Sequence, residues 1–468
     1  MAIRKNILEG LSVLLAASCA CSPDFSAVST SSSSSSSSST TAPQDASTSS
    51  TSDPDTSTTT SPDPLPDVPA EPPNPRALSL SLGGTSSCAT FDDGELRCWG
   101  GGSIGTREED MPAHAFGAPE VGGGVLGVAD GVARCAWLDT DVARCWNNPN
   151  YDGTTGYGYP ALFGDDEDPV YAPQLEALIT PSLIVAGLYH VCAADSRGVV
   201  VCWGGNDYYQ LGYGNTETIG DDEKPEDAGR VQTGGPVTAL GVGGGFTCAL
   251  RNDGVVCWGA NGGGSGRLGQ GTEPVYDFAD PAMLPAIQLG GTPVRLAVGE
   301  SHACAVLSNG AVRCWGSSEH GVLGLGEGVG DGLDVGDDEV PGVMPAINLG
   351  FGAEAIDVTC GYENTCALLD DGSVRCWGIH AVLGQGMGPQ TIGDDETPAS
   401  VTAIALPLPA THIALSKFAF AHACAILSDG TIRCWGDARG GALGYGDTED
   451  IGDDETPAEL PPVPVFEP

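Results

Sequence analysis

The stretch Cys366-Ala-Leu-Leu-Asp-Asp-Gly-Ser-Val-Arg-Cys376-Trp-Gly378 recurs in varied form seven times along the chain, and it decides the fold. Two short β-prone segments flank Asp-Asp-Gly, which is a strong hairpin signal. A three-residue loop at 370–372, with Gly372 left-handed, places Cys366 opposite Cys376 on antiparallel strands. The two cysteines are then close enough for a disulfide if they form a non-hydrogen-bonded pair.

Fourteen of the 17 cysteines form pairs of this kind. The first cysteine of a pair recurs every 47 to 62 residues, and a tryptophan directly follows the second cysteine of each pair. Export provides an oxidising compartment, so we expect one disulfide within each repeat. The expected disulfides are Cys88–Cys98, Cys135–Cys145, Cys192–Cys202, Cys248–Cys257, Cys304–Cys314, Cys366–Cys376 and Cys424–Cys434. We expect the tryptophans to be core residues: Trp99, Trp146, Trp203, Trp258, Trp315, Trp377 and Trp435.

The pair Cys248 and Cys257 is an exception, because its repeat lacks one residue after the turn. A three-residue loop would set Cys257 opposite Ala249, on the wrong face of the strand. A two-residue turn at 252–253 restores the pairing of the two cysteines but leaves Gly254 in a strand position. We therefore expect this pair to be strained, easily reduced or unbonded, and the other six to have ordinary geometry.

Each repeat is expected to contain about four short strands. An apolar strand precedes the first cysteine, the hairpin supplies two more, and glycine-rich sequence such as 211–214 follows the tryptophan. One such unit cannot bury a face alone, but neighbouring units can bury one another, and radial packing of four-stranded blades is a propeller. The pattern predicts an all-β, seven-bladed β-propeller over residues 76–468.

The repeat at 366–378, followed by Leu383-Gly-Gln-Gly386, resembles the repeat of the regulator-of-chromosome-condensation family. The resemblance implies a seven-bladed propeller that is closed by pairing between 76–82 and 460–466. The founding member of the family is a nuclear exchange factor for a small GTPase, and it also docks on nucleosomes. The export signal, the paired cysteines and the charge of this chain argue against both roles.

Residues 1–20 read as a bacterial export signal. Arg4 and Lys5 precede a short apolar stretch, and Leu15-Ala-Ala-Ser-Cys19 resembles a lipoprotein box, in which the cysteine carries lipid after cleavage. Cleavage after Ala20 by an ordinary signal peptidase is the alternative.

Residues 21–75 are rich in serine and threonine and then in proline, so we expect a disordered stalk. The expected location is the outer membrane or cell surface, by lipid anchor alone, or the surrounding medium.

The net charge is −44, from 18 Lys and Arg residues against 62 Asp and Glu residues. Such a surface repels phosphate backbones, which argues against nucleic-acid binding. The sequence contains no nucleophile elbow, no phosphate loop and no zinc-protease motif, so we predict that the protein is not an enzyme and binds no cofactor.

The preferred function is a monomeric, surface-displayed or periplasmic scaffold that binds an unidentified protein through a propeller face. The alternative is a structural or carbohydrate-contacting envelope protein without a tight soluble ligand.

Gly-Asp-Asp-Glu occurs in five repeats and predicts an acidic rim on the propeller. Three interpretations are open: solvated turns, which we prefer; a calcium site; and a docking surface for a cationic partner. Under the first interpretation, calcium raises the melting temperature little. The aspartates of the rim are Asp165, Asp166, Asp221, Asp222, Asp337, Asp338, Asp394, Asp395, Asp453 and Asp454.

His190, His302 and His422 each lie two residues before the first cysteine of a repeat. Equivalent positions in different blades are spread around the ring, so these histidines do not converge on a metal, and we expect them to make structural hydrogen bonds. Cys360 is the odd cysteine of the repeat region. Because other repeats have apolar residues at its position, we expect a buried thiol there.

Overall fold

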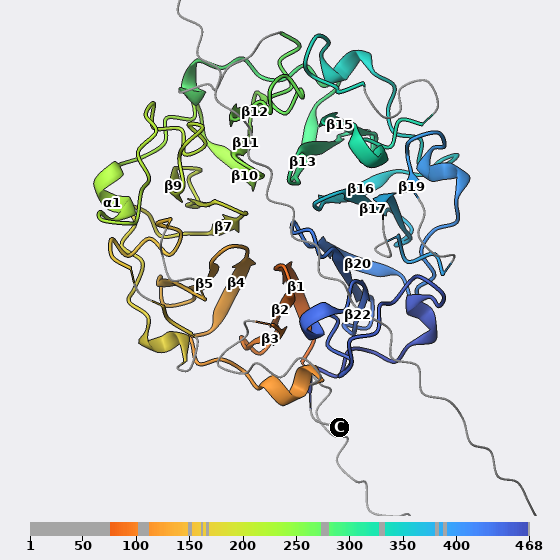
Figure 1. Cartoon of the computed structure of the whole chain (residues 1–468), viewed down its shortest axis with the longest axis horizontal. Coiled ribbons are helices and arrows are strands. Elements are labelled where there is room, and N and C mark those ends of the chain that lie inside the picture. Colours follow the sequence, from red (N-terminus) through yellow and green to blue (C-terminus); the bar gives the residue numbers. More distant parts are fainter. Residues whose placement is uncertain are drawn as a thin grey trace, which may run out of the picture. The chain divides into compact units, whose positions relative to one another are not determined.

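The computed structural model describes residues 75–101, 112–147, 152–160, 162–164, 168–272, 280–326, 333–379, 383–386 and 391–466. Within the compact unit Ala70–Pro468, seven antiparallel sheets follow one another along the chain. Figure 1 shows them arranged radially around a common centre. The predicted all-β, seven-bladed propeller is therefore confirmed, and its blades are numbered 1 to 7 in chain order.

Every blade begins with an inner strand, followed by the two strands of the cysteine hairpin. The inner strands are β1 (Ala77–Leu82), β4 (Val125–Asp130), β7 (Leu183–Ala186), β10 (Val237–Val242), β13 (Pro293–Val298), β16 (Ala355–Cys360) and β20 (Ala410–Leu415). The middle strands are β2 (Ser86–Phe91), β5 (Arg134–Leu138), β8 (His190–Ala194), β11 (Phe246–Arg251), β14 (His302–Leu307), β17 (Asn364–Leu369) and β21 (His422–Leu427). The third strands are β3 (Leu96–Gly100), β6 (Ala143–Trp146), β9 (Val200–Gly204), β12 (Gly254–Gly259), β15 (Val312–Gly316), β18 (Val374–Ile379) and β22 (Ile432–Gly436).

The fourth strand is shorter than the sequence suggested. Blade 6 has one, β19 (Thr391–Ile392), whereas in blades 3, 5 and 7 the described residues form a single bridge at that place, such as Gly204 with Ile219. A short helical turn follows, and most of these turns begin with a proline, whose fixed φ suits the first helical position. The helices are α1 (Pro225–Ala228), η1 (Ala113–Phe116), η2 (Pro169–Tyr171), η3 (Pro281–Met283), η4 (Glu319–Gly321), η5 (Pro341–Val343), η7 (Pro398–Ser400), η8 (Arg439–Gly441) and η9 (Pro457–Glu459). Helices of three or four residues are too short to span a bilayer, and the described residues contain none that are longer.

The hairpin register follows the prediction. Cys366 pairs with Cys376, and Gly372 at the turn has φ +80°. In the second repeat Asp141 takes the glycine position with φ +63°, a conformation that Asp tolerates better than most residues. All seven expected disulfides form, with Cα–Cα distances of 4.0 to 4.1 Å.

Blade 4 corrects one expectation. Cys248 and Cys257 are bonded, with their Cα atoms 4.1 Å apart, so the expectation of an unbonded pair is wrong, while its expected ease of reduction stays a prediction. Arg251 pairs with Gly254, which makes the turn two residues long. Gly254 has φ +131°, which few L side chains adopt, and this conformation absorbs the missing residue.

The ring does not close in the expected way. The strand β1 pairs with β2 of its own blade, not with the C-terminal segment, so the predicted pairing of 76–82 with 460–466 is wrong. The C-terminal segment instead lies against both blades at the junction: Val463 N donates to Ile432 O of blade 7 at 3.0 Å, and Arg97 Nη1 of blade 1 donates to Val465 O at 3.1 Å. Blade 1 packs directly beside blade 7, and Figure 1 shows β1 next to β20 and β22. Ser416 Oγ donates to Gly83 O at 2.6 Å across this junction.

The recurring tryptophans and histidines of the repeats hold neighbouring blades together. His190 Nε2 of blade 3 lies 2.7 Å from Thr247 Oγ1 of blade 4. The Thr247 hydroxyl donates to Gln210 O at 2.8 Å, and Trp258 Nε1 donates to the same carbonyl at 3.0 Å. We call this four-residue arrangement the clasp. It recurs with His302, Thr365, Val322 and Trp377, and with His422, Ser87, Ala442 and Trp99.

The clasp confirms that these histidines make structural hydrogen bonds. The seven tryptophans that follow a cysteine are fully buried, which confirms that they belong to the core. Because the hydroxyl proton of Thr247 goes to a carbonyl, His190 Nε2 must donate, so the neutral form of the ring carries its proton on Nε2. Burial lowers the pKa of His190 and His302 to about 3 and that of His422 to about 4.

Candidate functional site

Four of the five acidic loops lie among the described residues. In each, the two aspartates and the glutamate bring one carboxylate oxygen apiece within 4.8 Å of one another. The loops remain separate, because each belongs to a different blade and rests on a glycine-rich segment of the preceding one: a Cβ at Gly321 would lie 2.7 Å from Asp394 N. The four loops are Asp221–Glu223, Asp337–Glu339, Asp394–Glu396 and Asp453–Glu455. Asp165 and Asp166 lie outside the described residues.

Crowding of the carboxylates changes their protonation. The pKa of the glutamate in each loop is raised to about 7, first by burial and then by its hydrogen bond with the adjacent aspartate; these are Glu223, Glu339, Glu396 and Glu455. Each loop can therefore share a proton near neutral pH. A calcium ion requires six to eight oxygen ligands, and one loop brings together three carboxylate groups. This geometry agrees best with turns that are partly protonated, while the calcium interpretation stays a prediction to be tested by titration.

The inner strands of all seven blades line a central cavity of about 280 Å³. Lys417 of blade 7 reaches across it, and its Nζ donates to Val242 O of blade 4 at 3.0 Å. Burial lowers the pKa of this ammonium to about 8. Cys360 also lines the cavity as a buried free thiol, as expected, and burial raises its pKa to about 12. A thiol with so high a pKa is a poor nucleophile at neutral pH.

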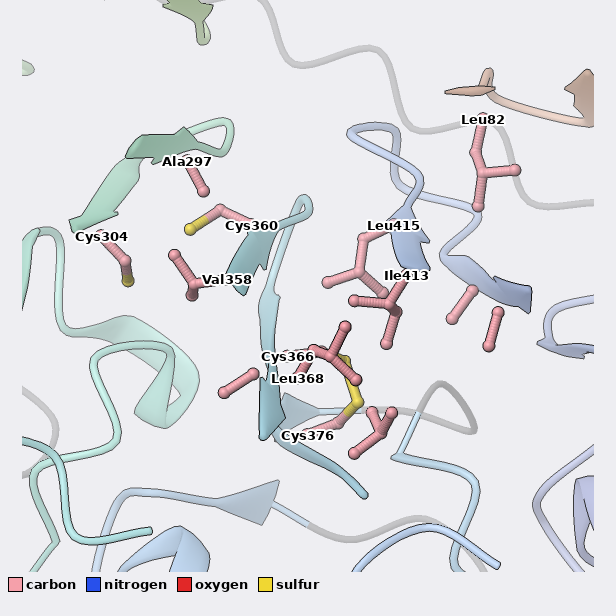
Figure 2. Packing of buried hydrophobic residues seen from close by; sticks show 14 of the residues in the cluster. Leu82, Ala297, Cys304, Val358, Cys360, Cys366, Leu368, Cys376, Ile413 and Leu415 are labelled. Carbon is pink, nitrogen blue, oxygen red and sulfur yellow. A yellow bond between two sulfur atoms is a disulfide. The ribbon is translucent and has the colours of Figure 1, made fainter. Parts of the chain in front are cut away.

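The packing around Cys360 is apolar. Figure 2 shows Cys360 and Val358 on the side of β16 that faces Ala297 and Cys304 of the preceding blade. All four residues belong to the same buried hydrophobic cluster. Cys360 therefore fills space between two blades.

A larger pocket opens between blades 3 and 4, with a volume of about 940 Å³. Its walls come from the loops that link inner to middle strands and from the loops that follow the third strands. Tyr189 and Tyr208 line it with 53% and 52% of their surfaces exposed. Asp207 and Glu300 add carboxylates, and Arg267 lies among them.

The repeat sequence does not reveal this pocket. The repeat pattern identifies what the blades share, and both tyrosines occupy loop positions at which the repeats differ. Two aromatic residues in polar loops, at 189 and 208, are the signal that was available. The packing of blade 3 against blade 4 brings the two tyrosines into one pocket.

The lipidation residue Cys19, the export signal and most of the stalk lie outside the described residues. Their assignment therefore stays a prediction.

Comparison with known proteins identifies the repeats. A family model described as "Regulator of chromosome condensation (RCC1) repeat" matches residues 182–210, 294–322 and 355–381, and a second of the same description matches 197–250. The ultraviolet-B receptor UVR8 of Arabidopsis thaliana is 30% identical over 284 residues, which are 60% of this chain and 58% of the receptor. The E3 ubiquitin-protein ligase HERC2 of Mus musculus is 29% identical over 48% of this chain and 4% of the ligase. The chain thus spans little more than half of the first relative and a small part of the second.

Two solved structures show the same fold. One is yeast RCC1 (Prp20) bound to Kap60, with a TM-score of 0.58 and 16% identity, over 82% of this chain and 85% of that one. The other is Prp20p from Saccharomyces cerevisiae, studied with its binding to Gsp1p and histones, with a TM-score of 0.54 and 17% identity, over 82% and 87%. Residues 182–250, 294–322 and 355–381 of this chain therefore match the regulator of chromosome condensation (RCC1) repeat, and the seven-bladed propeller has the fold of the yeast structures.

Proposed function

We propose that this chain is an exported scaffold, displayed at the cell surface or in the periplasm, that binds another protein through one face of its propeller. The observation that carries the proposal is the fold, which this chain shares with a propeller crystallised in complex with the protein Kap60. Fold likeness alone is an analogy, so the role rests also on the face itself. There, exposed tyrosines gather in a pocket, and tyrosine is enriched among residues that dominate protein interfaces.

The paired cysteines support an oxidising location, because disulfides of this kind persist in secreted proteins. The proposal assigns no reaction to the chain. The partners named for the yeast propellers, Kap60, Gsp1p and histones, are not carried over, because identities of 16% and 17% support a shared fold alone.

A capture experiment tests the proposal. The full chain is immobilised at increasing density and exposed to detergent extracts of the native cell envelope, and bound protein is quantified by mass spectrometry. A protein partner that saturates, and that soluble full chain displaces, is the expected result. If no bound protein saturates, the scaffold role is wrong and the structural or carbohydrate-contacting alternative is favoured.

A further inference from the structure

The pocket between blades 3 and 4, which we call the tyrosine pocket, is preorganised for binding. Asn206 is fully buried, and its Nδ2 donates to Asn215 O at 2.9 Å and to Glu217 O at 3.0 Å. Its Oδ1 accepts from Leu211 N at 3.1 Å, so one side chain fixes both ends of the loop that presents Tyr208. The loop also holds Tyr209 at φ +63°, a strained conformation for a non-glycine residue. Little ordering entropy remains to be lost on binding.

The backbone of the second tyrosine, Tyr189, is also fixed by a hydrogen bond. Gly205 N donates to Tyr189 O at 2.8 Å, which joins the loop of Tyr189 to the loop that carries Tyr208. The ring of Tyr208 lies against Gly245 of blade 4, where an added Cβ would stand 3.4 Å from Cδ2. Both rings therefore keep about half their surface free while their backbones are fixed.

The charge of the pocket is negative. Among the described residues that line it, Asp152, Asp207 and Glu300 are set against one cation, Arg267, whose Nη1 donates to Gly244 O at 3.3 Å. Thr218 belongs to the lining of this pocket and also to that of the neighbouring groove, which contains Asp221, Asp222 and Glu223. The tyrosine pocket thus adjoins an acidic groove. A cationic group placed over a tyrosine ring is attracted by the ring and by such carboxylates.

We propose that the tyrosine pocket receives a lysine or arginine side chain from a loop of the partner protein, an inference that rests on the scaffold role proposed above. The cation stacks on the exposed rings of Tyr189 and Tyr208, and Asp207 and Glu300 balance its charge. An uncharged saccharide would also stack on tyrosine, but it gains nothing from the excess of carboxylates. The observations therefore favour a basic protein loop.

Peptide binding to the full chain tests the stacking. The probe is Gly-Arg-Lys-Arg-Gly-amide carrying fluorescein on its N-terminal amine, measured by fluorescence polarisation at about 0.15 M salt, where long-range attraction is screened beyond about 8 Å. The double variant Tyr189→Ala/Tyr208→Ala should weaken binding roughly tenfold or more. The double change to Phe should preserve it, because the rings remain. Tyr171→Ala is the matched control, since Tyr171 is 72% exposed and lies outside the pocket.

A second pair of variants tests the charge. Asp207→Asn/Glu300→Gln should weaken binding several-fold, whereas Glu120→Gln, an exposed carboxylate elsewhere, should not. Circular dichroism and melting curves establish that each variant is folded. Absence of peptide binding, an equal loss in the controls, or displacement of the peptide by chitotriose would each overturn the inference.

Failure of this inference can be told apart from failure of the scaffold role. A partner that saturates in the capture experiment and is retained by the Tyr189→Ala/Tyr208→Ala variant would place the interface elsewhere and leave the scaffold role standing. Peptide binding that behaves as expected, without any saturating protein partner, would contradict the scaffold role but support the chemistry of the pocket.

Discussion

Single histidines join neighbouring blades in a way that makes stability sensitive to pH. The pKa of His302 falls from 6.5 to about 3 on folding, mainly through burial. Below pH 6.5, His302 binds a proton in the unfolded chain but remains neutral in the folded chain. The stability that His302 contributes is therefore fully present above about pH 6.5 and is lost as the pH falls toward 3.

We expect His302→Ala to lower the free energy of unfolding by about 2–4 kcal/mol at pH 7.5, because it leaves a cavity and removes the partner of Thr365. The difference in the free energy of unfolding between wild type and variant should narrow as the pH falls from 6.5 toward 4. Urea denaturation at several pH values measures both. His320→Asn is the control, since its side chain is 45% exposed and its φ of +62° suits asparagine. A gap independent of pH would contradict the assignment of a neutral buried histidine.

The turn of blade 4 depends on one glycine. A Cβ at Gly254 would lie 2.9 Å from the Cβ of Ala286, and φ there is +131°. Gly254→Ala should therefore destabilise the protein by about 1–3 kcal/mol. Gly235→Ala, where the nearest atom would be 4.0 Å away and φ is not positive, should have little effect. Thermal denaturation compares the two, and equal melting temperatures would argue against the strained turn.

At the scale of the blades, the clasp follows an alternating pattern. Its histidines belong to blades 3, 5 and 7, and its hydroxyls belong to blades 4, 6 and 1. Seven blades cannot be paired without a remainder, and blade 2 is the one left over. It joins blade 1 through hydrogen bonds with Ser86: Arg134 Nη2 donates to Ser86 Oγ at 2.8 Å, and Ser86 Oγ donates to Asp130 Oδ2 at 2.8 Å. Within blade 2, Arg134 and Asp130 form a buried ion pair at 2.9 Å. The odd blade is thus held by different chemistry.

The disulfides should all lie within blades. Peptide mapping under non-reducing conditions is expected to recover seven links between cysteines of one repeat, with Cys360 labelled by a thiol reagent after unfolding. Each closed loop is shorter than the 15 residues for which about 3 kcal/mol is estimated, so each contributes less than that. Reduction should loosen hairpins before it opens the ring. Links between different repeats, or free thiols at most of the fourteen positions, would contradict the hairpin register.

The acidic loops should make the protein less stable as the pH rises. A glutamate with a pKa raised from 4.5 to about 7 binds its proton more tightly in the folded state, so it favours folding at low pH and loses this effect as the pH rises from 4.5 through 7. Replacing the four glutamates of the described loops by glutamine should raise the melting temperature at pH 8 and change it little at pH 5. Scanning calorimetry across this range measures the difference. A difference that does not vary with pH would mean that the loops do not share protons.

At the scale of the whole molecule, the N-terminal sequence predicts a tether. The mature chain is expected to partition with membranes into detergent, and Cys19→Ala should release it or stall its processing. Mass spectrometry of the mature N-terminus detects the lipid directly. An unmodified N-terminus at Ser22 or later would rule out lipidation.

The sequence by itself determined the blade. Cys366 and Cys376 are ten residues apart, so the turn between them fixes their register without help from the rest of the molecule, and seven copies of the pattern fixed the architecture. The tertiary structure alone decided how the blades meet. His190 lies 57 residues from Thr247, and Tyr189 meets the loops of blade 4 in a pocket. Contacts of this kind depend on how one sheet packs on the next, and the spacing of the repeats carries no information about that packing. The pairing expected to close the ring was therefore wrong and the repeats do not reveal the tyrosine pocket, although the cysteine register of the six hairpins with three-residue turns was predicted correctly.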